Sequence, residues 1–393
     1  WQSEKNGFRH LYHYDLTGRE RRALTQGSWE VTDLYGYDAQ RGALYFQAAA
    51  KSPLRREVYS VALRKGKPRK IIADPGLNSA RFSPDFGFFI HTFSTINTPP
   101  RYVLRSRDGK KVRDLETNEA LAAKQLEYGV APVDFFQIPA SVAPQRGAWP
   151  KDGLNAWMIK PRGAAFQGKR SPLLMFVYGG PGSQQVLDSW RGANYWWFQM
   201  LAQQGYVVAC VDNRGTGGRG EAFKKSTYLR LGDLETADQI AAACYLGTYP
   251  FIDPQRIGIF GWSYGGFMSS LCILKGADVF KAAIAVAPVT HWKWYDSIYT
   301  ERYMRTEEEN PEGYADNAPL NHAANLLGAY LLAHGIADDN VHFQHAAELS
   351  SRLIAANKSF DSIFYPGQNH GISGRGMRLH LYGLMTDFLK KNL

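Results

Sequence analysis

The segment around Ser263 has the residue types and the spacing of a serine nucleophile. Gly261 and Gly265 flank the serine in a GxSxG pattern. The apolar run RIGIF (256–260) precedes it as an expected strand, and GFMSSLCILKG (266–276) follows it as an expected helix. In a nucleophile elbow, small flanking residues permit a tight strand-to-helix turn that exposes the serine hydroxyl. We therefore predict a nucleophile here, against the alternative of a plain strand-to-helix turn.

A serine nucleophile needs a base that takes its proton and an acid that orients this base. In a strand–elbow–helix protein the chain order is serine, acid, histidine. Downstream of the elbow, Asp338 and Asp339 follow one expected strand, and His370 follows the last one in a loop that contains glycine. We predict that His370 is the base, and spacing alone does not separate the two aspartates. Three further histidines are weaker candidates for the base: His334, His342 and His345.

Acyl transfer also needs hydrogen-bond donors for the oxyanion. The backbone N–H of Tyr264, directly after the serine, is the first expected donor. The second is expected in VYGGPGSQQ (177–185), from the phenol of Tyr178 or a backbone N–H of Gly179 or Gly180. The sequence contains neither a P-loop nor a cluster with metal-ligand spacing, so we expect no cofactor and no metal.

Residues 127–393 contain the strands and helices that must position these groups. Strands that are apolar on both faces and alternate with amphipathic helices predict a parallel sheet covered on both sides, and such sheets bind ligands at the carboxyl ends of their strands. The expected strands are PLLMFVYGG (172–180), YVVACVDNRG (206–215), RIGIFGWS (256–263), KAAIAVAP (281–288), AYLLAHG (329–335) and SIFYPG (362–367). The expected helices include DLETADQIAAACYLG (233–247), NVHFQHAAELSSRLIAAN (340–357) and MRLHLYGLMTDFLKKNL (377–393).

Residues 1–126 have a different pattern, in which short strands alternate with turns. Tyr12, Tyr59 and Tyr102 mark corresponding positions 47 and 43 residues apart. A period of this length built from four short strands is typical of propeller blades, and two to three blades cannot close a ring. We therefore predict the last blades of an incomplete β-propeller at 1–126, with a small β-sandwich as the alternative. A helix in NEALAAKQLEYG (118–129) forms the junction to an α/β domain at 127–393.

Composition excludes several classes of protein. Hydrophobic residues make up 45% and charged residues 21%, as in an ordinary globular protein, and no apolar run is long enough for a membrane span. The net charge is +10, but the basic clusters lie in turn-rich stretches and carry no nucleic-acid-binding motif. Three isolated cysteines predict buried thiols and leave the compartment open. The chain opens at Trp1 in strand-like sequence, so we expect it to be a piece of a longer protein.

Taken together, these segments resemble the prolyl oligopeptidase family of serine peptidases, and within it the dipeptidyl peptidase IV branch. The resemblance covers nearly the whole chain. It is carried by GWSYGGF, VYGGPGSQ, DNRGTGGRG, VAPVTHWKWYDSIYTERYM, HGIADDNVHF and NHGIS. It implies an α/β-hydrolase domain capped by a β-propeller, whose last blades correspond to the first 125 residues.

Position by position, the resemblance implies Ser263 as the nucleophile, Asp338 as the triad acid and His370 as the base. Tyr178 resembles the tyrosine whose hydroxyl completes the oxyanion hole, and Asn340 the residue that helps to hold the substrate carbonyl. The residues that resemble the wall of a pocket for proline are Tyr264, Val289, Trp292, Tyr295, Tyr299 and Val341. Without the resemblance, this aromatic cluster would be interpreted as ordinary core.

One feature of the branch has no counterpart in this sequence. Dipeptidyl peptidases grip the substrate ammonium with a glutamate pair from an early propeller blade, whereas EEEN (307–310) lies in the wrong domain. We expect the pair in a propeller segment outside this chain, with changed specificity as the alternative.

The predicted function is release of X-Pro or X-Ala dipeptides from free N-termini through an acyl-enzyme. Alternatives are a prolyl tripeptidyl or acylaminoacyl peptidase, a non-catalytic binding homologue, and a lipase or esterase. The resemblance suggests a homodimer, and we expect a soluble periplasmic or secreted protein without nucleic-acid partners.

Overall fold

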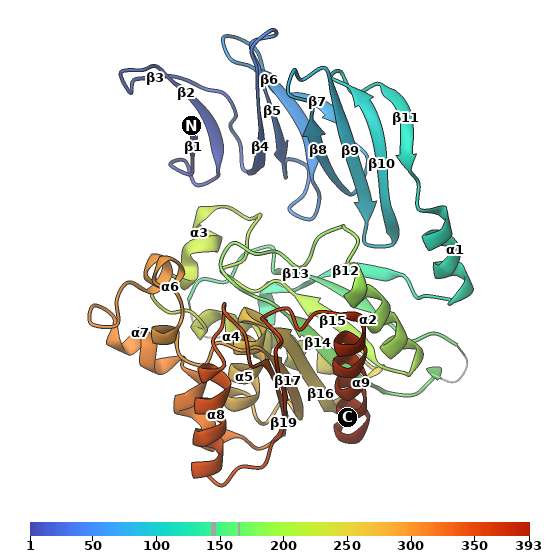
Figure 1. Cartoon of the computed structure of the whole chain (residues 1–393), viewed down its shortest axis with the longest axis vertical. Helices are drawn as coiled ribbons and strands as arrows, with labels where there is room; N and C mark the ends of the chain where they lie inside the picture. Colours follow the sequence, from blue (N-terminus) through green and yellow to red (C-terminus); the bar gives the residue numbers. More distant parts are fainter. Residues whose placement is uncertain (143–146, 164–165) are drawn as a thin grey trace. The chain divides into compact units, whose positions relative to one another are not determined.

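Antiparallel strands fill the first part of the chain, and a mixed sheet with helices fills the rest (Figure 1). This computed structural model describes residues 1–142, 147–163 and 166–393. The chain divides into two compact units. The first comprises Trp1–Pro132, Val186–Tyr195 and Gly217–Lys224, and the second Val133–Gln185, Trp196–Thr216 and Lys225–Leu393. The predicted boundary between residues 126 and 127 stays a prediction.

The first unit contains three antiparallel sheets, with strand orders β1-β2-β3, β4-β5-β6-β7 and β11-β10-β9-β8. The predicted repeat is visible in the register, because Tyr12, Tyr59 and Tyr102 lie on β2, β6 and β10, each followed by one further strand of its sheet. The strands are β1 (Gln2–Ser3), β2 (His10–Tyr14), β3 (Glu20–Ala23), β4 (Val31–Asp38), β5 (Ala43–Ala48), β6 (Glu57–Ala62), β7 (Arg69–Ile72), β8 (Leu77–Phe82), β9 (Phe88–Thr95), β10 (Thr98–Ser106) and β11 (Lys111–Glu116). Two of the three sheets are four-stranded, as predicted for blades, and the first sheet has three strands. The predicted junction helix is α1 (Glu119–Glu127).

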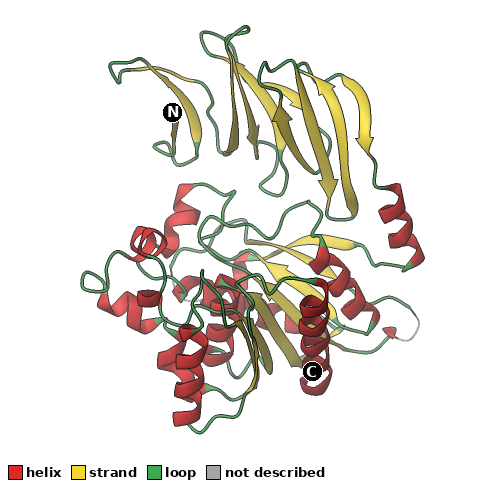
Figure 2. Ribbon diagram, viewed as in Figure 1, coloured by secondary structure: helices red, strands yellow, loops and turns green. Residues whose placement is uncertain are grey.

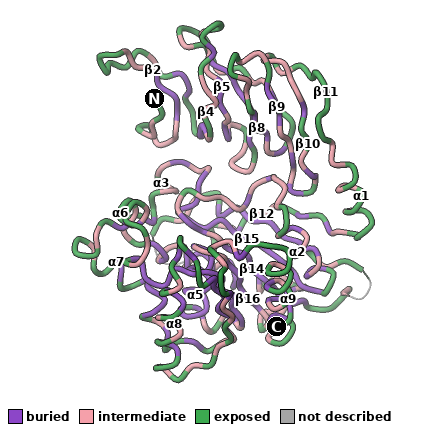
Figure 3. Tube along the Cα trace, viewed as in Figure 1, coloured by how far each residue is buried: buried purple, intermediate pink, exposed green. Residues whose placement is uncertain are grey.

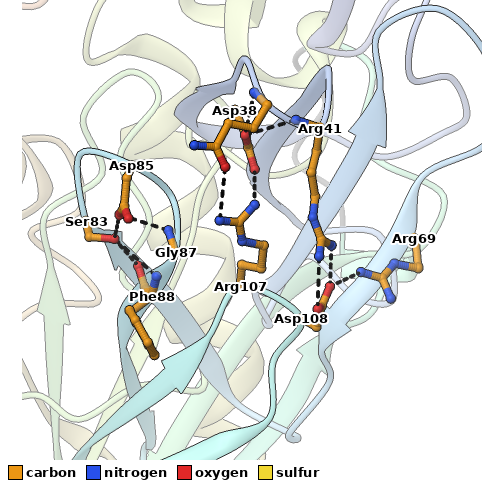
Figure 4. A network of polar contacts seen from close by, with 10 residues as sticks. Asp38, Arg41, Arg69, Ser83, Asp85, Gly87, Phe88, Arg107 and Asp108 are labelled. Carbon is orange, nitrogen blue, oxygen red and sulfur yellow. Dashed lines mark hydrogen bonds and ion pairs between the residues drawn. The ribbon is translucent and has the colours of Figure 1, made fainter.

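Apolar side chains and ion pairs join neighbouring sheets of this unit. Val58 of β6 lies in one buried cluster with Ala80 and Phe89 of the next sheet. Between the same two sheets, Asp38 at the end of β4 pairs at 3.4 Å with Arg107 in the turn that follows β10 (Figure 4). The Asp38 side chain is 1% exposed, so this pair is shielded from solvent, whereas the exposed pairs around Asp108 contribute little. The two sheets are therefore joined both by buried apolar contacts and by one ion pair whose carboxylate is buried.

The second unit is built on an eight-stranded sheet with the order β12-β13-β15-β14-β16-β17-β18-β19. The strands are β12 (Val133–Ile138), β13 (Leu154–Ile159), β14 (Ser171–Val177), β15 (Val207–Val211), β16 (Ile252–Trp262), β17 (Ala282–Val286), β18 (Ala329–Gly335) and β19 (Asp361–Tyr365). Pairing is parallel from β15 to β19, which confirms the predicted parallel sheet, and antiparallel at β12 and β13, two strands that the sequence analysis did not identify.

Helices flank this sheet, and strands β13, β14, β15 and β17 are buried along their length (Figures 2 and 3). The predicted helix at 233–247 is α4 (Asp233–Gly247), and the other two predicted helices are α8 (Gln344–Ala355) and α9 (Arg375–Asn392). The other helices are α2 (Ala193–Gln203), α3 (Glu221–Lys224) of the first unit, α5 (Tyr264–Lys275), α6 (Ser297–Met304) and α7 (Pro311–Asp316). In the part of the chain that the structure describes, no helix has the length and apolar character needed to cross a membrane.

Candidate active site

Ser263 occupies the turn between β16 and α5 in a strained backbone conformation. Its φ is 61° and its ψ is −119°, a combination that costs a non-glycine residue about 1–3 kcal/mol. The surrounding structure holds it there, because its N–H donates to the carbonyl of Val286 at 2.8 Å and its carbonyl accepts from the N–H of Phe267 at 3.0 Å. The predicted elbow geometry is therefore present.

Close backbone approach explains the two glycines of the GxSxG pattern. A Cβ atom at Gly261 would lie 2.0 Å from the carbonyl oxygen of Gly265. A Cβ atom at Gly265 would lie 2.2 Å from the carbonyl oxygen of Val177, at the end of β14. Both distances are far below van der Waals contact, so the turn closes only with hydrogen at these positions.

Asp338 and His370 form a hydrogen-bonded pair at the carboxyl edge of the sheet. Nδ1 of His370 lies 2.8 Å from Oδ2 of Asp338. The Asp338 carboxyl is fully buried, whereas the imidazole of His370 is 24% exposed. Asp339, the alternative acid, is exposed. The geometry therefore places the first aspartate of the pair, and not the second, against the histidine.

The Asp338 carboxylate is held from several directions. Its Oδ1 accepts the backbone N–H groups of Asn340 and Val341, both at 2.9 Å. Nε2 of the buried His334 lies 3.3 Å from Oδ2 and 2.8 Å from the carbonyl oxygen of Val341. Burial alone would raise the pKa of Asp338, but the hydrogen bonds from His334 and His370 outweigh it and hold this pKa well below its usual range. The group is thus an anion that can orient an imidazole.

Ser263 and His370 are brought to one edge of the sheet by the strands that precede them. β16 and β17 are parallel neighbours, as are β17 and β18, and β18 and β19. The indole N–H of Trp262, next to the serine, donates to the carbonyl oxygen of His370 at 3.0 Å. Within residues 1–142, 147–163 and 166–393, the Ser263 hydroxyl forms no hydrogen bond with His370. Catalytic hydrogen bonds often close only in the substrate complex.

The expected oxyanion donors lie around the same turn. Tyr264 is the first residue of α5, so its backbone N–H has no acceptor within the helix. Tyr178 follows β14, and its ring centroid is 6.0 Å from that of Tyr264. A Cβ atom at Gly180 would meet both rings at 3.0–3.1 Å, so that glycine allows them to approach. The carbonyl oxygen of Gly179 accepts from Nδ2 of Asn213 at 3.0 Å, a bond that does not involve the N–H, so the N–H groups of Gly179 and Gly180 stay alternative donors.

The predicted pocket aromatics are in mutual contact. Trp292 lies 5.5 Å from Tyr264, 5.8 Å from Tyr295 and 5.8 Å from Tyr299, measured between ring centroids. The hydroxyl of Tyr295 donates to Oδ1 of Asn340 at 2.9 Å, which links this cluster to the loop that carries the acid. The two predicted valines, Val289 and Val341, are buried.

Comparisons with known proteins identify the family. Residues 192–393 match the sequence model of the prolyl oligopeptidase family, and residues 1–100 match that of the dipeptidyl peptidase IV (DPP IV) N-terminal region. The chain belongs to the prolyl oligopeptidase family. Together, the two matches place it in the dipeptidyl peptidase IV branch of this family, as the sequence motifs predicted.

Relatives in this family match the chain over nearly its whole length. "Dipeptidyl peptidase 4" of Trichophyton equinum is 35% identical over 94% of this chain and 48% of that protein. "Probable dipeptidyl peptidase 4" of Aspergillus flavus is 33% identical over 97% of this chain and 49% of that protein. The crystal structure of Porphyromonas gingivalis dipeptidyl peptidase 4 matches with a TM-score of 0.93 and 44% identity, over 100% of this chain and 54% of that chain. The chain thus spans about half the length of these prolyl oligopeptidase relatives.

Three residues in or beside the site make contacts that were not predicted from the sequence. Glu235 lies inside the predicted helix 233–247, and its carboxylate accepts a hydrogen bond from Tyr264. Tyr303 packs on Tyr299 with ring centroids 4.8 Å apart. His334 had been considered only as a weaker base, and it contacts Asp338 instead. For Glu235 the sequence offered a partial signal, because a glutamate three residues after the N-cap can accept the N-cap N–H, although Gly232 lacks the side chain of a full capping box.

Proposed function

We propose that this chain carries the catalytic site of a serine peptidase that releases X-Pro or X-Ala dipeptides from peptides. The observation that carries the proposal is the Asp338–His370 hydrogen bond at the sheet edge where Ser263 occupies its strained turn. This arrangement supplies an acid, a base and a nucleophile in the chain order of an α/β-hydrolase. The names of the relatives support a dipeptidyl product.

In the proposed mechanism, Nδ1–H of His370 donates to Asp338, which leaves the Nε2 lone pair to accept the Ser263 proton. The serine oxygen attacks the scissile carbonyl, and the tetrahedral oxyanion accepts hydrogen bonds from the Tyr264 N–H and the Tyr178 hydroxyl. His370 then passes the proton to the leaving amine as the C–N bond breaks. Water, deprotonated by His370, hydrolyses the ester that remains on Ser263.

The proposed selectivity for proline or alanine before the cleaved bond depends on the aromatic cluster. The rings of Tyr264, Trp292 and Tyr299 and the valines offer a compact apolar wall. A proline ring is buried favourably against such a wall, whereas a charged side chain would lose its hydration without gaining a partner. Asn340, already bonded to Tyr295, would help to hold the substrate carbonyl.

A panel of chromogenic substrates tests the proposal. We expect the protein to hydrolyse Gly-Pro anilide in preference to Ala-Ala-Pro and N-acetyl-Pro anilides. Preference for the Ala-Ala-Pro anilide would indicate a tripeptidyl peptidase in place of a dipeptidyl peptidase. Preference for the N-acetyl-Pro anilide would indicate an acylaminoacyl peptidase. Turnover of none of the three would favour a non-catalytic binding homologue.

A homodimer and a periplasmic or secreted location remain predictions from the family resemblance. Sedimentation equilibrium tests the first, since a homodimer would give twice the mass of the single chain. Cell fractionation tests the second, because a cytoplasmic protein would stay with cytoplasmic markers.

A further inference from the structure

A carboxyl group with no obvious reason to be buried lies behind the candidate active site. Glu235, at the start of α4, is fully buried. Its Oε1 accepts the hydroxyl of Tyr264 at 2.8 Å, and its Oε2 accepts the backbone N–H of Gly232 at 3.0 Å. No cation forms an ion pair with it among the described residues. The buried Arg214 pairs instead with Asp238, three residues along α4.

Helix capping alone does not account for this position. A glutamate at the third helical position caps a helix equally well from an exposed site, where its charge stays hydrated. Here burial is unfavourable to the charged form and raises the pKa of Glu235 to about 8. The oxygen that does not cap the helix accepts the hydroxyl of Tyr264. Compared with an exposed capping glutamate, the buried Glu235 therefore gains the hydrogen bond with Tyr264.

Tyr264 contributes to the site both through its backbone N–H and through its ring. Its backbone N–H follows the nucleophile, and its ring packs against both Phe267 at 5.2 Å and Trp292 at 5.5 Å, measured between ring centroids. The hydrogen bond from its hydroxyl to Glu235 anchors the far end of the ring. A buried tyrosine hydroxyl without an acceptor would force the ring to move or would leave a polar group unpaired.

We propose that Glu235 is a positioning residue that fixes the Tyr264 ring and thereby sets the shape and the selectivity of the pocket for the residue before the cleaved bond. This inference rests on the proposed function. Glu235 acts through the tyrosine and has no contact with substrate. Its loss should therefore change the discrimination between proline and alanine, and it should do so only while the Tyr264 hydroxyl is present.

A double-mutant cycle tests this coupling. We expect Glu235→Leu and Tyr264→Phe each to lower kcat/KM for Gly-Pro anilide by about 10- to 100-fold, as misplacement of a supporting group does. Each should also change the ratio of Gly-Pro to Gly-Ala hydrolysis by more than about threefold. The double variant should be no worse than the more impaired single variant, because both changes break one interaction. In Glu235→Gln the amide oxygen can still accept from the N–H of Gly232, and the NH2 group can donate to the oxygen of Tyr264 in a reversed hydrogen bond, so this variant should keep more of the activity and of the ratio than Glu235→Leu.

Thr236→Val is the matched control. Thr236 neighbours Glu235 on α4, is buried, and its hydroxyl has no hydrogen-bond partner within the described residues. We expect this variant to keep the wild-type substrate ratio. A ratio equally disturbed in Thr236→Val would show a general effect of α4 and would overturn the inference.

The remaining outcomes separate this inference from the proposed function. If wild type cleaves both substrates but the two single losses multiply in the double variant, Glu235 does not act through Tyr264 and only the inference fails. If wild type cleaves neither substrate, the proposed function fails and the inference with it. Should Glu235→Leu not fold, Tyr264→Phe still decides, because an unchanged substrate ratio in that variant overturns the role of the hydroxyl.

Discussion

Nδ1 of His370 and Oδ2 of Asp338 lie 2.8 Å apart, although 32 positions separate the two residues in the chain. Parallel strands produce this contact: Asp338 follows β18 and His370 follows β19, and the two strands are hydrogen-bonded neighbours. Carboxyl ends of parallel strands meet at one edge of a sheet, so loops distant in sequence become adjacent.

Exchange of either aspartate for asparagine will show which one serves as the acid. Asp338→Asn keeps the shape but replaces the carboxylate that orients His370, and we expect kcat to fall by about 10⁴-fold. Asp339→Asn is the control at an exposed position, and its steady-state rates should stay close to wild type. The reverse ranking of the two variants would contradict the observed geometry.

The close approach at the elbow predicts a steric penalty at Gly265. The methyl group of Gly265→Ala would lie 2.2 Å from the carbonyl oxygen of Val177, so β14 or α5 must shift. We expect a loss of about 1–3 kcal/mol in the free energy of unfolding, measured by urea denaturation, together with loss of activity.

Gly383→Ala provides the control for this loss. Gly383 lies inside α9, and an added Cβ atom meets nothing within 4 Å. We expect this change to raise the free energy of unfolding by about 0.5–1 kcal/mol, since alanine favours the helix. Equal effects of both alanine substitutions would rule out the steric explanation.

The buried ring of His91 leads us to expect that the first unit becomes less stable in acid. Its Nε2 pairs with Oδ1 of Asn78 at 2.8 Å and its Nδ1 accepts from Nε of Arg105 at 3.0 Å, so the native state requires a neutral ring. Burial, followed by the charge of Arg105, lowers the pKa of His91 to about 4, below its unfolded value of about 6.5. The unfolded state therefore binds more protons, and the stability present above pH 6.5 decreases as the pH falls towards 4.

Hydrogen exchange of the β9 amides at several pH values measures this effect. We expect opening to become easier by up to about 1.4 kcal/mol for each pH unit over this range. His91→Gln should remove the dependence. Protection that stays constant between pH 6.5 and 4 in wild type would contradict the prediction.

The sequence predicted those parts of the site that depend on local pattern and strand order. The GxSxG turn, the acid loop and the histidine loop each follow an apolar run, so their meeting at the sheet edge could be inferred. β13 was missed although all six of its residues are buried, because it pairs antiparallel outside the alternating strand–helix pattern.

Contacts between elements could not be predicted in this way. Glu235 meets Tyr264 because α4 packs on α5, and His334 meets Asp338 because a strand end and the next loop fold back on each other. Neither contact leaves a periodic signal in the chain. The same holds for residues 186–195 and 217–224, which belong to the first unit although they lie far along the sequence.

The most direct test of the account is kcat/KM for Gly-Pro anilide with wild-type protein and with Ser263→Ala. We expect measurable turnover by wild type and a loss of at least about 10⁴-fold in the variant, because the acyl-enzyme cannot form without the serine oxygen. Circular dichroism should show that the variant keeps its fold. Activity in Ser263→Ala within tenfold of wild type would contradict the account.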